Sequence, residues 1–169
     1  CSLSEARLMF RQGEVQIAEE LVRRAERLVA PFKSAWHHAE SYRCLGLIAV
    51  YQNNYEHARY YLYQSLQLLW DAGYSQFATG ILVRIAQVLY FEGQLERAVE
   101  IVSLLHNVPA THRDIYNGMD RGWNMPVQYD DLCIELEDSL SPDQFTMVWS
   151  RGQELDLSKL VADLLSEMK

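Results

Sequence analysis

Cysteine and proline are scarce in this chain of 169 residues, which contains three cysteines and four prolines. Cys1, Cys44 and Cys133 are far apart and odd in number, which excludes the paired framework of a small disulfide-rich secreted protein. No signal peptide is visible, and no apolar run approaches the roughly 20 residues that a membrane-spanning helix needs. These absences favour the reducing cytoplasm.

Motifs of nucleotide and metal chemistry are also missing. The sequence has no GxxxxGK(S/T) phosphate loop, no GxGxxG turn and no CxxC pair. His37 and His38 are adjacent, so on a helix they point about 100° apart and do not readily share one ion. The other histidines lack a partner at ligand spacing: His57, His106 and His112. We therefore predict no metal site and no cofactor.

Positive charge is the minority, with 15 Lys and Arg against 23 Asp and Glu and a formal net charge of −8. This balance argues against direct binding to nucleic acid, whose phosphates require a basic face, and against a polybasic membrane patch. Hydrophobic residues make up 49% of the chain, which is enough for one globular domain with a sizeable core.

Residues that could suggest catalysis have simpler interpretations. Cys44 precedes Leu45 and Gly46 on a helix expected to pack, where a small buried side chain is the usual role. The acidic residues between Asp130 and Asp138 have helical spacing, which is typical of a solvated helix face. We expect no enzyme. The alternative that stays open is a small enzyme with a site in the 107–126 loop, near His106, His112, Asp114 and Asp120.

What the sequence does contain is a repeat with a spacing of 40 residues. A turn former is followed two positions later by an apolar residue and three after that by alanine, in the segments Gly13 to Ala18, Asn53 to Ala58 and Gly93 to Ala98. A repeat of this length predicts a solenoid of stacked helical units. Such folds present surfaces for binding and seldom house chemistry.

Apolar residues recur at helical spacing up to about residue 107, and no alternation of period two persists. The pattern predicts helical hairpins with a short turn inside each and a longer turn between them. Clear helices are expected over 36–52, 77–91 and 95–105. Small residues mark the point where the two helices of each hairpin cross, because bulky ones would hold them apart. The pairs are Ala6 with Ala18, Gly46 with Ala58, and Ala86 with Ala98.

The repeat fades beyond residue 107. Pro109, Gly118, Gly122 and Pro126 interrupt it, so we predict an irregular connection over 108–126. Helical patterns return over 127–140, after the cap Ser141-Pro142 with Gly152 closing that helix, and from Leu157 onwards. Terminal segments of solenoids cover an otherwise exposed face. We therefore predict that 127–169 forms capping helices in the same domain as the repeats of 1–107.

This pattern resembles the tetratricopeptide repeat (TPR) family over roughly residues 5–107. Tyr42-x-x-Leu45-Gly46 is similar to the start of its first-helix signature, and Asn53 to Ala58 is similar to its turn. The resemblance implies an all-α fold, a TPR-like α-α superhelix of about three repeats. Two departures are the period, which is usually 34, and the signature Trp, replaced here by Tyr42 and Leu82.

The long period and the tail resemble the C-terminal TPR regions of bacterial STAND-type NTPases and transcription regulators. The similar tail segments are Leu140 to Pro142, Trp149 to Leu157 and Val161 to Leu165. The resemblance implies a protein-binding or ligand-sensing module of a cytoplasmic signal-transduction protein, with the NTPase elsewhere in the parent chain. The first residue is Cys1 and not Met, so we expect a piece of a longer protein. A stand-alone TPR scaffold or co-chaperone-like adaptor is the alternative.

In TPR hairpins the first helix of each unit lines a concave groove. The repeat register places these residues there: Arg7, Phe10 and Arg11, then Glu40, Arg43, Leu47 and Tyr51, then Val83, Arg84, Gln87, Tyr90 and Phe91. Arginine grips carboxylates with two parallel hydrogen bonds, and aromatic rings serve as apolar anchors. We predict that the groove binds a protein or an acidic or C-terminal peptide segment. Pairing of these arginines with Glu and Asp of neighbouring helices is the alternative.

Overall fold

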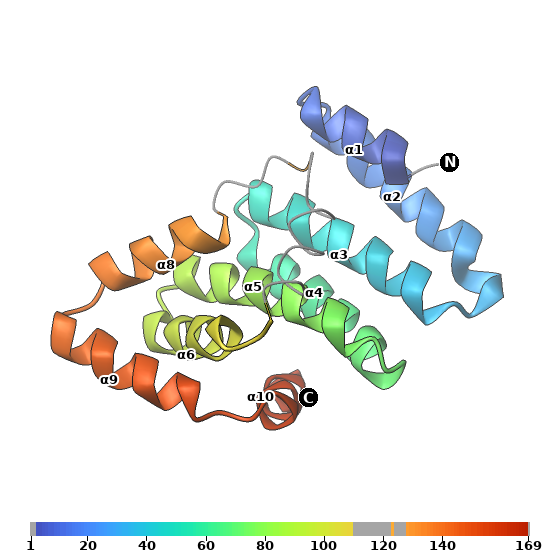
Figure 1. Cartoon of the computed structure of the whole chain (residues 1–169). Coiled ribbons are helices and arrows are strands. Elements are labelled where there is room, and N and C mark those ends of the chain that lie inside the picture. The colour runs from blue at the N-terminus through green and yellow to red at the C-terminus, as the bar shows by residue number, and fades with distance from the viewer. Residues whose placement is uncertain (1–2, 110–122, 124–127, 169) are drawn as a thin grey trace.

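The computed structural model describes residues 3–109, 123 and 128–168, and within these ranges every regular element is helical (Figure 1). The all-α expectation is confirmed for this part of the chain. The elements are α1 (Leu3–Arg11), α2 (Val15–Val29), the short 3-10 helix η1 (Ala30–Phe32), α3 (Ala35–Tyr51), α4 (Tyr55–Asp71), α5 (Ser75–Phe91), α6 (Leu95–His106), α8 (Tyr129–Asp138), α9 (Pro142–Gln153) and α10 (Leu157–Ser166).

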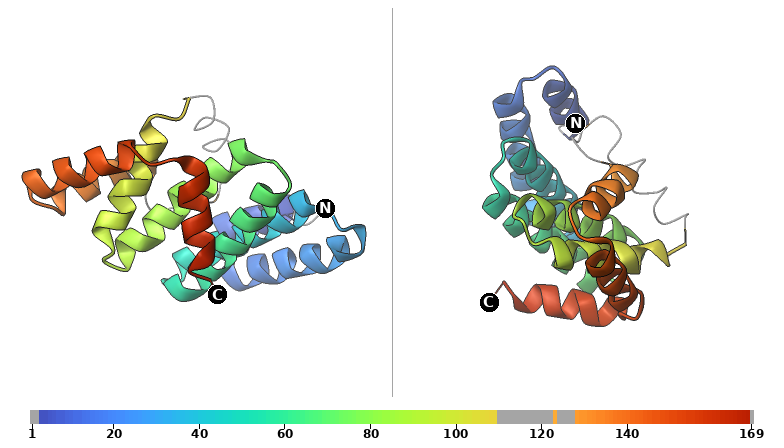
Figure 2. Two further views of the ribbon diagram at one scale, coloured as in Figure 1. Left: turned by 90° about the horizontal axis from the view of Figure 1, so that it is seen from below. Right: turned by 90° about the vertical axis from the view of Figure 1, so that its left-hand side faces the viewer.

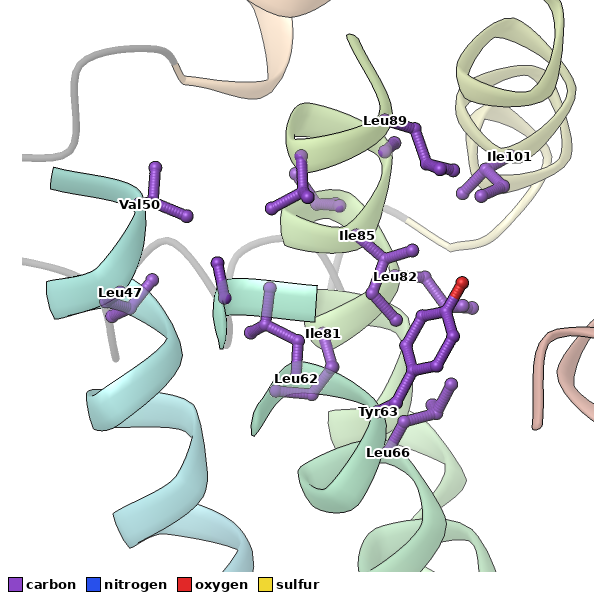
Figure 3. Close-up of a cluster of buried hydrophobic side chains, with 14 of the residues drawn as sticks. Leu47, Val50, Leu62, Tyr63, Leu66, Ile81, Leu82, Ile85, Leu89 and Ile101 are labelled. Atoms are coloured by element: carbon purple, nitrogen blue, oxygen red, sulfur yellow. The ribbon is translucent and has the colours of Figure 1, made fainter. Parts of the chain in front are cut away.

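The first six α-helices form three successive antiparallel pairs. Helix α1 packs on α2, α3 on α4 and α5 on α6, while α2 also packs on α3 and α4 on α5. Their apolar faces meet in one continuous core (Figure 3). The side chains labelled there are Leu47 and Val50 from α3, Leu62, Tyr63 and Leu66 from α4, Ile81, Leu82, Ile85 and Leu89 from α5, and Ile101 from α6.

The small residues lie where the helices cross, as the sequence predicts. The five alanines of the three pairs have no exposed surface, and Gly46 is buried. A Cβ atom built on Gly46 would stand 2.8 Å from Cγ of the fully buried Leu62. Close packing therefore explains a glycine inside a helix, where it costs about 1 kcal/mol relative to alanine.

The turns recur every 20 residues rather than every 40. The backbone adopts a left-handed φ at Gly13, Lys33, Asn53, Gly73 and Gly93. The expectation of a longer turn between hairpins is wrong for the α4–α5 junction, because residues 72–74 match residues 52–54 in length. Between α2 and α3 the chain inserts η1. The structural unit is thus one helix with its turn.

These turns share one hydrogen-bond pattern, which explains their residues. At the end of α5 the N–H of Gly93 donates to the carbonyl of Tyr90 (3.0 Å), and that of Gln94 donates to the carbonyl of Leu89 (2.8 Å). The same pair of bonds closes α1, α3 and α4. Such a terminus places one residue in the left-handed region, which favours glycine or asparagine.

The C-terminal helices cover the last hairpin. Helix α8 contacts α5 and α6, α9 packs along α6, and α10 reaches back to α4 (Figure 2). The helix predicted over 127–140 is α8, which begins at Tyr129 and ends at Asp138. Most of the predicted irregular connection, 110–122 and 124–126, lies outside the described residues. None of the described helices is both long enough and apolar enough to span a membrane.

Gly152 does not end its helix, contrary to the sequence prediction, because α9 continues to Gln153. It lies where α9 crosses α6. A Cβ atom there would stand 2.6 Å from the carbonyl oxygen of Glu100 and 2.8 Å from its Cα. Beside this contact, the Ser103 hydroxyl donates to the carbonyl of Trp149 (2.5 Å). Gly152 is therefore another close-approach position, like Gly46.

Candidate ligand groove

Much of the predicted groove face is buried. Arg43, Leu47, Arg84 and Gln87 on α3 and α5 expose 2% or less of their surface, and Phe10 of α1 exposes 4%. The remaining predicted residues are more accessible: Arg11 and Tyr51 are exposed, Arg7, Glu40, Tyr90 and Phe91 are half-buried, and Val83 is buried.

An indole ring occupies the α1–α3 end of this face. Trp123 is 2% exposed, and its ring centroid lies 5.2 Å from that of Phe10. Phe10 in turn meets Tyr51 edge-to-face at 4.9 Å. Trp123 also borders a small cavity of about 110 Å³, whose other lining residues are Leu3, Ser4, Arg7, Glu40, Arg43 and Cys44. The face therefore accommodates a large aromatic side chain.

The sequence prediction missed Trp123. The available signal was the residue type, since a tryptophan in a segment that lacks helical periodicity still has 150–250 Å² to bury. The repeat register assigns no place to such a residue, because position 123 lies beyond the repeats.

Arg43 is held by a two-pronged contact within its own helix. Its Nε donates to Oε2 of Glu40 (2.9 Å), and its Nη2 donates to Oε1 of the same carboxylate (2.5 Å). This planar pairing fixes the guanidinium group beside the cavity. The arginine does meet an acidic partner, although that partner lies on α3 and not on a neighbouring helix.

Gln87 places an amide donor on the buried face of α5. Nη1 of Arg84 donates to its Oε1 (2.9 Å), which orients the side chain. Its Nε2 has no hydrogen-bond partner among the described residues, and the residue has no exposed surface. A buried polar group without a partner costs about 1–3 kcal/mol. An acceptor brought to this nitrogen would recover that cost.

Tyr90 and Phe91 do not join the cluster around Trp123. The Tyr90 hydroxyl donates to Oε2 of Glu135 on α8 (3.1 Å), and desolvation together with this bond raises the pKa of Tyr90. The Phe91 ring stacks on Tyr55 of α4 at 5.2 Å. The end of α5 thus serves packing between helices, which the projected register did not anticipate.

A second depression lies between α2, α3 and α4. This cavity of about 170 Å³ is bordered by Glu19, Arg23, Gln52, His57 and Tyr61. Arg23 donates to Glu19 (2.7 Å) and to the Tyr61 hydroxyl (3.0 Å), and its guanidinium lies over the Tyr61 ring. These groups already satisfy one another, so the depression is a weaker candidate for ligand binding.

The catalytic alternative gains little from the described residues. No three His, Cys, Asp or Glu side chains within them are arranged to hold a metal ion. His106 lies against the Trp149 ring at 5.5 Å, and Cys44 is buried as expected. The acidic residues of α8 are exposed, as predicted. The other residues of this hypothesis lie outside the described part: His112, Asp114 and Asp120.

No protein-family model, no curated protein and no solved structure matches this chain. What the groove binds is therefore inferred from its own residues.

Proposed function

We propose that this chain is a non-catalytic binding module of the TPR type, in which α1, α3 and α5 line a concave groove for a peptide segment of a protein partner. Three hairpins with small residues at every crossing support a TPR-like superhelix. On the same resemblance we propose the C-terminal TPR region of a STAND-type bacterial regulator, acting in the cytoplasm. A stand-alone TPR scaffold is the second candidate.

The burial of Trp123 against Phe10 carries this proposal. It is an internal example of what the groove holds: a bulky aromatic ring beside the fixed guanidinium of Arg43. Burying such a ring removes 150–250 Å² from water, worth about 4–6 kcal/mol. A partner segment would then carry an aromatic anchor, with acceptor groups for Arg43 and for Nε2 of Gln87, and would compete with Trp123.

The test uses a fluorescent peptide with the sequence of residues 118–128 and a matched peptide whose tryptophan is alanine. Fluorescence anisotropy measures the binding of each to the Trp123→Ala chain and to the unaltered chain. We expect the variant to bind the tryptophan peptide at least about tenfold more tightly than the alanine peptide. The unaltered chain should bind the tryptophan peptide more weakly, because its own Trp123 occupies the groove.

Two controls separate groove binding from other effects. Circular dichroism reports whether Trp123→Ala keeps its helical content, and Trp123→Phe provides a milder variant if it does not. Trp149→Ala removes an indole from α9 and should not create peptide binding. Equal affinity for the two peptides in both Trp123 variants would refute the groove proposal. The parent-protein proposal is tested separately, and the lack of an NTPase-coding segment upstream in the same gene would contradict it.

A further inference from the structure

The first hairpin carries an apolar face that no described residue covers. Leu8 of α1 is 50% exposed, and Ile17 and Leu28 of α2 are 45% and 60% exposed. Ile17, half-buried Leu21 and Leu28 recur at helical spacing, so they form one stripe along α2. The stripe borders a shallow hollow whose other lining residues are Glu20, Arg23, Arg24 and Arg27.

The equivalent positions in the other hairpins are buried. Forty residues after Leu8 stands Ile48, which is 1% exposed, and forty further stands Val88, which is fully buried. Leu21 corresponds to the half-buried Tyr61 and the fully buried Ile101. The exposure of this face is therefore particular to the first hairpin, although its residue types follow the repeat.

The helix that precedes each later hairpin covers these positions. Helix α2 lies on α3, so that Glu19 and Arg23 stand across the same cleft as Ile48. Helix α4 lies on α5 in the same way. The first hairpin has the receiving face but no described helix upon it.

A polar contact marks the register at both junctions. Nε2 of Gln52 donates to Oε2 of Glu19 (3.5 Å), and forty residues later Nη1 of Arg59 donates to Oε2 of Glu92 (2.9 Å). The same two repeat positions are therefore bridged at each junction. In the first hairpin the receiving position is Gln12, which is exposed at the end of α1.

We propose that the face formed by Leu8, Gln12, Ile17, Leu21 and Leu28 is the stacking surface for a further helical hairpin of this repeat, joined ahead of α1. Its second helix lies over α1 as α4 lies over α5. It places apolar residues against Leu8 and a polar or charged side chain opposite Gln12. This surface is separate from the groove, and the proposal does not depend on what the groove binds.

The experiment supplies such a hairpin from the chain itself. An extended chain carries a copy of residues 55–74, then a copy of 35–42, then residues 3–169, which keeps the register because position 43 corresponds to position 3. Leu8→Glu is made in the extended chain and in the unaltered one, and thermal unfolding is followed by circular dichroism. Ile134→Glu on α8, where Ile134 is 59% exposed, is the matched control.

We expect the extended chain to melt at a higher temperature than the unaltered one. Leu8→Glu should lower the melting temperature of the extended chain by about 5 °C or more, and that of the unaltered chain by less than about 2 °C. Ile134→Glu should act equally in both. Equal effects of Leu8→Glu in the two chains, or an extension that adds no stability, would overturn the proposal. So would an unaltered chain that sediments as a dimer and becomes monomeric with Leu8→Glu, since a second copy would then cover the face.

Discussion

Replacing Gly152 by alanine should destabilise the protein, although alanine is the better helix former. The added Cβ would stand 2.6 Å from the carbonyl oxygen of Glu100 and 2.8 Å from Cβ of Ser103. Ordinary contacts of a Cβ atom are 3.4 Å or longer. The nearest atoms belong to the backbone of α6, so no side-chain rotation relieves the overlap and α9 must move away from α6.

The magnitude follows from three contributions. Alanine in a helix gains about 1 kcal/mol over glycine. Overpacking against a rigid neighbour costs about 1–3 kcal/mol. Separation of the helices also weakens the bond from Ser103 to the carbonyl of Trp149, worth about 1 kcal/mol. The balance is a net loss of about 1–3 kcal/mol, which lowers the melting temperature by about 2–12 °C for a chain of this length.

Thermal unfolding and urea unfolding measure this loss. Met147→Ala on the same helix is the control, because Met147 is 57% exposed and its loss should change stability by less than about 0.5 kcal/mol. Ser103→Ala should cost less in the Gly152→Ala background than alone, since the bond to Trp149 is already weakened. An increase in melting temperature for Gly152→Ala would refute the reasoning, because helix propensity would then outweigh the close approach of α9 and α6.

Two further predictions concern a turn and a buried phenol. Lys33 has a φ of +49°, so Lys33→Gly should raise the melting temperature by about 1–4 °C, while Lys33→Ala, which keeps the Cβ, should bring no such gain. Burial, and then the nearby Glu167 carboxylate, raise the pKa of Tyr63. Its contribution to stability is therefore complete below its unfolded pKa of about 10 and is lost as the pH rises above it. Urea unfolding between pH 8 and 11 should show a smaller alkaline loss for Tyr63→Phe, and an unchanged loss would contradict this assignment.

The helical hairpins were predictable because their causes are local. Gly13, Asn53 and Gly93 mark turns by their own tolerance of a left-handed backbone, and the small residues lie twelve positions apart around each turn. The turn at Lys33 gave no such signal, since a lysine in that conformation is held by its surroundings. The same limit applied to Gly152, where one glycine has the same appearance as a helix end and as a crossing point.

The groove residues show where prediction from the repeat stops. The register correctly places Arg7, Phe10 and Arg43 near one another, because hairpin geometry repeats. Their burial depends on Trp123, which lies eighty positions beyond Arg43 and belongs to no repeat. Tyr90 and Phe91 leave the groove because α8 and α4 offer them partners, and no pattern within α5 indicates those contacts.

The sequence by itself determined that this protein is helical in hairpins of about 40 residues, and where the first two helices of each hairpin turn and cross. These features follow from backbone preference and side-chain size at positions close in the chain. Only the tertiary structure decided that the step is one helix of 20 residues, that Trp123 lies against the groove, and that Leu8 is left uncovered while Ile48 and Val88 are buried. Burial is a property of what a residue meets across the fold, and residues distant in the chain supply it.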